Sequence, residues 1–180
     1  MSIIFSLIIG IIITLFAPII SNIVYAIAQS PEAQSAGGEK YLNIRLLETP
    51  AILLFLAITG FFRGLENTFI PLIGSVFIFV ANVVLDYSFI YGKFGMPVLG
   101  VTGAAWATLI ANVIGTIVMF VFLYKSQLTK TYLKLIFKFK QLKKDYIKIA
   151  TEIGIFMGLP SLAFLIFMFL FSHLGPQTIA

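Results

Sequence analysis

Two polar residues interrupt the apolar run at residues 81–89, which reads ANVVLDYSF. Asn82 and Asp86 are four residues apart, so a helix places them on one face, and Ser75 lies two turns before Asn82 on roughly the same face. Carboxylate, amide and hydroxyl oxygens are the groups that hold a hard cation, and a carboxylate also takes up a proton. The spacing therefore indicates a place where a positive ion can bind.

A second polar series follows in the next apolar segment. Thr108, Asn112 and Thr116 recur every four residues, beside a row of small residues that lets another helix approach closely: Gly103, Ala107, Ala111 and Gly115. The link at 92–100, GKFGMPVLG, is short and contains three glycines and a proline. We expect it to make the two segments antiparallel neighbours whose polar series face each other.

The composition identifies the kind of element that holds these residues. The 180 residues are 60% hydrophobic and 11% charged, with a mean hydropathy of +1.07, whereas a soluble domain is about half apolar and a quarter charged. An integral membrane protein is the class that fits. The chain has no Cys and a single His, His173, which excludes disulfides, thiolate catalysis and a Cys-based metal site. We expect no cofactor and no enzymatic activity.

Five apolar segments are long enough to cross a bilayer, which takes about 20 helical residues. Backbone groups in hydrocarbon must be hydrogen-bonded within the segment, so the spans are helices and the fold class is all-α, a polytopic membrane protein with five transmembrane helices. Pro18, Pro50 and Pro160 are candidate kinks, whereas Pro71 falls in a first helical turn. The predicted spans are Ile3–Ala28, Tyr41–Phe62, Phe69–Tyr91, Val101–Tyr124 and Ile149–Phe171.

The positive charges predict the orientation. Eight of the twelve Lys and Arg residues lie in 125–148, so the positive-inside rule makes this loop, and with it the N-terminus and 63–68, cytoplasmic. Segments 29–40 and 92–100 are then external. The basic loop is also amphipathic, which indicates a helix on the anionic inner leaflet of the bilayer and requires no nucleic acid. We expect a multi-pass protein of the cell (inner) membrane.

Asp86 has the strongest functional signal among the polar residues of the spans. For Ser75, Asn112 and Thr116, hydrogen bonding between helices is a sufficient explanation. A mid-membrane carboxylate costs about 2.5–3.5 kcal/mol on insertion scales, and it persists where it faces protein or water. The cations nearest to Asp86 in sequence lie at or beyond the membrane boundaries. Arg45 and Glu48, by contrast, are expected to form an ion pair near the outer boundary.

The residues from Gly60 to Ala111 resemble the multidrug and toxic compound extrusion (MATE) transporters. The resemblance rests on GFFRGLENTFIPLIGS, ANVVLDYSFIYGKFGMPVLGVTGAAWATLIA and, further on, GLPS at 158–161 with LGPQTIA at 174–180. It implies twelve helices in two six-helix lobes, of which the five spans look like the third to the seventh. Residues 1–124 would then be part of the first lobe, 125–148 a basic cytoplasmic linker and 149–180 the start of the second lobe.

The resemblance also implies a site and a function. Asn82 and Asp86 match the polar pair that lines the first lobe's cavity, and Thr108 matches a hydroxyl facing it. Thr59 stands where many relatives have Asn before Gly-x-x-Arg, and Asn112 completes the candidate cavity. The implied function is a cation-coupled multidrug antiporter that exports amphipathic organic cations by alternating access. A proton or sodium ion would bind at Asp86, and the chain would act with the missing remainder of the transporter.

Two other functions remain open from the sequence. A flippase for lipid-linked precursors shares the wider architecture, although such a protein is expected to place several cationic residues inside its cavity, and the spans here contain almost none. A non-transporting membrane scaffold or subunit would use Asp86 only to hold helices together. The scaffold predicts that neutralising Asp86 changes folding or assembly but not a gradient-driven flux.

Overall fold

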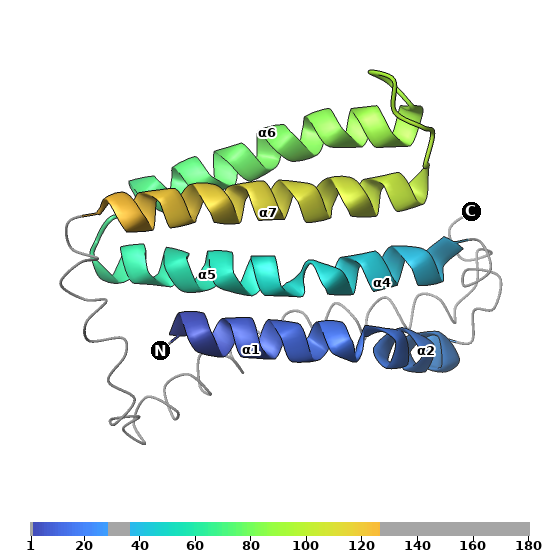
Figure 1. Cartoon of the computed structure of the whole chain (residues 1–180), viewed down its shortest axis with the longest axis horizontal. Coiled ribbons are helices and arrows are strands. Elements are labelled where there is room, and N and C mark those ends of the chain that lie inside the picture. Colours follow the sequence, from blue (N-terminus) through green and yellow to red (C-terminus); the bar gives the residue numbers. More distant parts are fainter. Residues whose placement is uncertain (1, 29–36, 127–180) are drawn as a thin grey trace, which may run out of the picture. The chain divides into compact units, whose positions relative to one another are not determined.

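The computed structural model describes residues 2–28 and 37–126, all of which belong to one compact unit. Its regular elements are helices, which confirms the all-α class for the part of the chain described. Figure 1 shows them as neighbouring helices that run back and forth along a common direction. They are, in chain order, α1 (Ser2–Leu15), α2 (Ala17–Ala28), α4 (Glu39–Leu47), α5 (Thr49–Gly64), α6 (Phe69–Tyr91) and α7 (Val101–Lys125).

Three helical stretches are long and apolar enough to cross a membrane: Glu39–Gly64, which joins α4 and α5, then α6 and α7. The pair α1 and α2 makes a fourth candidate if its two parts form one span. The three stretches agree with the second, third and fourth predicted spans, and the α1–α2 pair covers the first. The fifth predicted span, 149–171, and the basic loop beyond Ser126 lie outside the described residues.

The first predicted span is not one straight helix, because α1 and α2 meet at an angle of 60°. Pro18 lies at this bend and has no N–H to donate to the carbonyl of Thr14, four residues earlier. The chain continues as a helix on both sides, with Ile20 donating to Phe16 and the Ser21 hydroxyl donating to the Pro18 carbonyl. The kink expected at Pro18 is therefore present.

The second span continues as one helical stretch, with a break of one residue, Glu48, between α4 and α5. Pro50 cannot donate to the carbonyl of Leu46, which would be costly to leave unpaired in hydrocarbon. Two hydroxyls bond that carbonyl instead: Thr49 Oγ1 at 2.7 Å and Thr14 Oγ1, from α1, at 3.2 Å. Helix α1 approaches closely here, since a Cβ added at Gly10 would be 2.5 Å from Pro50 Cα.

Helices α6 and α7 form an antiparallel pair in intimate contact, as the short link between them predicts (Figure 1). Gly103 packs directly on the backbone of Phe89. A Cβ atom added at Gly103 would lie 2.7 Å from the Phe89 carbonyl oxygen, which is too close. At the other end a Cβ at Gly74 would stand 2.7 Å from the Met119 sulfur. Gly103, Ala107, Ala111 and Gly115 are all buried, so the predicted small row is the contact surface.

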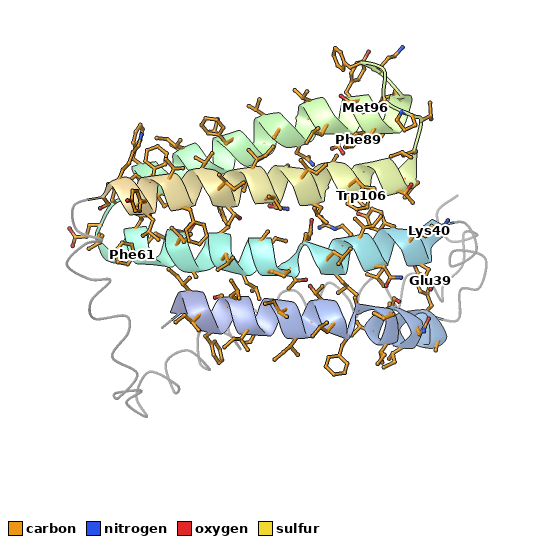
Figure 2. The ribbon with its side chains drawn as sticks, in the orientation of Figure 1. Glu39, Lys40, Phe61, Phe89, Met96 and Trp106 are labelled. Carbon is orange, nitrogen blue, oxygen red and sulfur yellow. The ribbon has the colours of Figure 1, made fainter. Side chains whose placement is uncertain are left out.

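Helices α5 and α7 run parallel and share the apolar core. The buried residues Ile58 and Phe62 of α5 pack with Met119 and Leu123 of α7. Side chains from four helices surround this cluster: Ile3, Phe55, Phe61, Ile70 and Phe122. Figure 2 shows Phe61 near the end of α5 that is opposite to Lys40 and Glu39 on α4, so the core lies toward one end of the bundle.

The outward face of α6 is apolar except for Ser75. Its exposed side chains include Leu72, Val76, Phe79 and Val83, each more than half exposed. Exposing so much apolar surface to water would be unfavourable, whereas the acyl chains of a bilayer solvate it. The exposure pattern thus agrees with the membrane location predicted from composition.

The close contact at Gly115 can be tested by adding one methyl group. A Cβ there would be 2.1 Å from Ile78 Cγ1, so Gly115→Ala should destabilise the α6–α7 pair by about 1–3 kcal/mol. Unfolding in a mixed-detergent titration, followed by circular dichroism, measures this. Adding Ile78→Ala should recover part of the loss, because it removes the clashing atoms.

Gly60→Ala is the matched control. Gly60 lies within α5 and has nothing within 4 Å of an added Cβ, so this variant should be neutral or more stable by up to about 1 kcal/mol. Equal losses for Gly115→Ala and Gly60→Ala would contradict the packing described.

Candidate functional site

Helix α7 carries a column of three polar residues, each of which reaches a different neighbour. Thr108 contacts α6, Asn112 contacts the junction of α4 and α5, and Thr116 contacts α5. The residues are one turn apart, so the column extends about 12 Å along the helix. Helix α7 therefore links the polar groups of the described unit.

The first member of the column joins two residues predicted to form the site. The Asn82 side-chain nitrogen donates to Thr108 Oγ1 at 3.3 Å, and the Thr108 hydroxyl donates in turn to the Ala104 carbonyl at 2.9 Å. This arrangement uses the amide nitrogen of Asn82. Its carbonyl oxygen has no partner among the described residues and is left as an acceptor.

Asp86 lies one turn from Asn82, toward the α6–α7 link. Its Oδ1 atom is buried without a hydrogen-bond partner in the described part of the chain. No Lys or Arg of that part forms an ion pair with it. A buried carboxylate oxygen without a partner is unusual and calls for a missing donor or ion. Asp86, with the adjacent acceptor of Asn82, is an oxygen-rich position with no positive group of its own.

Asn112 is joined to a different carboxylate. Its side-chain nitrogen donates to Glu48 Oε2 at 3.4 Å, while Arg45 Nη1 lies 2.6 Å from Glu48 Oε1. The predicted Arg45–Glu48 ion pair is present, but the side chain of Glu48 is only 2% exposed, against 34% for Arg45. Glu48 is thus buried inside the protein, and its position relative to the membrane boundary stays a prediction. The sequence signal for the burial of Glu48 is its position inside an apolar span, two residues before Pro50.

The remaining polar residues do not join the site. Thr59 is buried and its Oγ1 has no partner in the described residues, but it lies eleven residues beyond Glu48, about 16 Å along the helix. The Ser75 hydroxyl donates to the Pro71 carbonyl of its own helix, and the residue is exposed. Of the three polar residues expected to share one face of α6, Asn82 and Asp86 therefore remain in the site and Ser75 does not.

These positions define what the site can do. Asp86, Asn82 and Thr108 offer carboxylate, amide and hydroxyl oxygens, which suit a proton or a hard cation. Within residues 2–28 and 37–126 no three His, Cys, Asp or Glu side chains gather as ligands for a metal ion. Asn112 and Thr59 stay predicted cavity residues: the first is bonded to Glu48, and the second lies in a separate part of α5.

Comparison with known proteins finds one family and several relatives to which the chain is similar. Residues 1–88 match the MatE family. Protein DETOXIFICATION 43 of Arabidopsis thaliana is 46% identical over 86 residues, which are 48% of this chain and 16% of that protein. The probable multidrug resistance protein YoeA of Bacillus subtilis (strain 168) is 25% identical over 151 residues, covering 84% of the chain and 33% of the relative. No solved structure matches the chain.

These matches agree with the resemblance to the MATE transporters: residues 1–88 match the MatE family, and relatives named as multidrug resistance proteins are similar to a longer part of the chain. Members of this family are membrane transporters rather than enzymes, in agreement with the expectation from the sequence. The probable multidrug resistance protein NorM of Thermotoga maritima is 29% identical over 66% of the chain and 25% of its own length. The chain spans about a sixth to a third of the length of these relatives.

The Asn82–Thr108 bond can be measured with a double-mutant cycle. Asn82→Ala and Thr108→Val each remove one partner, and we expect a coupling energy of about 0.6 kcal/mol, up to about 1.7, as for hydrogen bonds between other membrane helices. Unfolding in mixed detergent gives the four stabilities. A cycle of Ser75→Ala with Thr108→Val is the control and should show no coupling, because Ser75 bonds only its own helix. Additive effects at Asn82 and Thr108 would mean that the bond contributes nothing.

Proposed function

We propose that these helices belong to a cation-coupled exporter of amphipathic organic cations, in which Asp86 binds the coupling ion. The observation that carries the proposal is the buried Oδ1 of Asp86, which has no partner among the described residues and lies one turn from the free acceptor of Asn82. Thr59 Oγ1 is also buried without a partner there, but Asp86 is ionisable, so its oxygen can be satisfied by a proton or a cation. The arrangement therefore favours ion binding over a scaffold role.

The chemistry of coupling follows from the charge of Asp86. A carboxylate in a membrane span is stable only while its charge is compensated or exposed to water. A proton or sodium ion at Asp86 would supply that compensation, with Asn82 and Thr108 as further oxygen ligands. Loss of the ion makes the site suitable for a positively charged substrate, so the two cations bind alternately. A site that opens to each side of the membrane in turn converts this competition into exchange transport.

The relatives support the substrate class. YoeA and NorM bear the name probable multidrug resistance protein. Apolar and aromatic side chains dominate the spans described here, and flexible Met and flat aromatic groups suit varied amphipathic substrates. We extend the activity of such relatives to the whole transporter in which these helices act. The drugs, the coupling cation and the lipid bilayer are its proposed partners.

We also propose the inner membrane of a bacterial-type cell, with the N-terminus and 125–148 in the cytoplasm. The α5–α6 link, which follows Arg63, and the α6–α7 link lie at opposite ends of the bundle (Figure 1). The positive-inside rule then makes the α6–α7 link external. Asp86, five residues before the end of α6, would lie in the outer half of the membrane.

Replacement of Asp86 by Asn tests the function. The change keeps the size of the side chain and removes its charge, so gradient-driven export should fall at least tenfold while the amount of protein in the membrane stays the same. The measurement is accumulation of a fluorescent organic cation in cells without other exporters that express the transporter carrying these residues. Ser75→Ala, on the same helix, is the control and should export normally. Normal export by Asp86→Asn would disprove the proposed role.

Single cysteines test the orientation, since the chain contains none of its own. Lys93→Cys in the α6–α7 link should react with a membrane-impermeant maleimide in intact spheroplasts. Thr68→Cys, exposed in the link before α6, should react only after the membrane is permeabilised. The opposite pattern would reverse the proposed orientation.

A further inference from the structure

Hydrogen bonds from α1 and α7 to the span formed by α4 and α5 gather at the junction of these two helices. On one side, Thr14 of α1 donates to the Leu46 carbonyl. On the other, Asn112 donates to Glu48 and the Thr116 hydroxyl lies 2.9 Å from the Ala51 carbonyl oxygen. All of these contacts fall within six residues, 46–51, around a proline that removes a helical hydrogen bond.

The two halves of the span are held in different ways. Helix α5 buries Ile58, Thr59 and Phe62, and two of these belong to the apolar core. Helix α4 buries only Ile44. The α5 half therefore has more of its side chains buried than the α4 half, which packs on α2 and α7 and has its polar contacts with α1 and α7 at its end.

The contact between Glu48 and Asn112 is suited to breaking and re-forming. Its length of 3.4 Å is at the long end for a hydrogen bond, so it is weaker than the ion pair at 2.6 Å. Arg45 belongs to α4 and compensates the Glu48 charge whether or not Asn112 is in contact. Separation of α4 from α7 would thus leave no isolated charge in the membrane.

We propose that residues 48–50 are a hinge and that the Asn112–Glu48 contact is its latch, so that α4 can tilt away from α7 while α5 stays in place. Proline and the unpaired carbonyl it creates are the usual origin of such a bend in a helix. The Thr49 hydroxyl, bonded to Leu46, stays with the hinge and keeps that carbonyl paired during the movement.

The hinge is placed to act on the proposed ion site. Thr108 of α7 pairs with Asn82, and Asn112, one turn further along, pairs with Glu48. Asp86 and helix α4 therefore flank the same half of α7, the half that ends at the α6–α7 link. Tilting of α4 would open that half. This connection rests on the proposed function, whereas the hinge itself does not.

Spin-label distances in the chain, reconstituted in lipid nanodiscs, test the hinge directly. The absence of native Cys permits two label pairs at exposed positions: Lys40→Cys with Val101→Cys across α4 and α7, and Leu56→Cys with Val121→Cys across α5 and α7. Lys40 is ten residues from Pro50, about 15 Å, so a tilt of about 20° moves it by about 5 Å. Asn112→Ala should lengthen or broaden the first distance by this amount and leave the second unchanged.

Three further variants make the test decisive. Asn112→Ser, whose side chain is too short to reach Glu48, should give the same shift. Thr116→Val removes the hydrogen bond from Thr116 to the Ala51 carbonyl of α5 and should leave both distances unchanged. Adding Pro50→Ala to Asn112→Ala restores a donor for the Leu46 carbonyl, so it should return the first distance to its original value.

The proposal is overturned if the α4–α7 distance does not change in the Asn112 variants, if the α5–α7 distance changes with it, or if Pro50→Ala fails to restore it. These distances are recorded without a cation gradient or a drug. The hinge and the ion-coupled transport can therefore fail independently: loss of export in Asp86→Asn with fixed distances in Asn112→Ala would support the transporter and reject the hinge.

Discussion

The close approach of α6 and α7 is the contact on which the rest of the described unit depends. Lipid is as apolar as the side chains it surrounds, so helices in a bilayer gain little from burying leucine or valine against one another. They associate where small residues let the backbones come near and where polar groups meet. Gly103 and Gly115 of α7 and Gly74 of α6 provide this contact from one end of the pair to the other.

The same approach brings polar groups within bonding distance. The small row and the polar column are adjacent on α7, so the packing that presses α6 against Gly103 and Gly115 also brings Asn82 to Thr108. The bonds use the nitrogen atoms of Asn82 and Asn112 and leave their oxygens as acceptors. Packing thus decides which polar atoms remain available, and on α6 these are the oxygens of Asn82 and Asp86.

The two proline breaks follow the same constraint. A proline in water would expose a carbonyl to solvent at little cost, but in hydrocarbon that carbonyl needs another donor. At Pro50 the donors are hydroxyls, one from Thr49, the residue before the proline, and one from Thr14 of α1. The break is stable for this reason, and it lies beside the buried Glu48. A weak point in the helix and a charged contact with α7 therefore occur at one place, which is what a hinge with a latch requires.

The sequence by itself determined the membrane class, the spans from Glu39 to Lys125, the antiparallel pairing of α6 with α7 and the small-residue contact surface. These properties depend on local composition and on periodicity, and a bilayer leaves few alternatives. It also indicated the kink at Pro18 and singled out Asn82 and Asp86, while beside Pro50 the helix has a break of one residue. Only the tertiary structure decided that Glu48 is buried and bonded to Asn112, 64 residues away, that Ser75 faces outward and that Thr59 lies apart. The rotation of each helix about its axis and its register against its neighbours fix those contacts, and both result from packing between segments far apart in the chain.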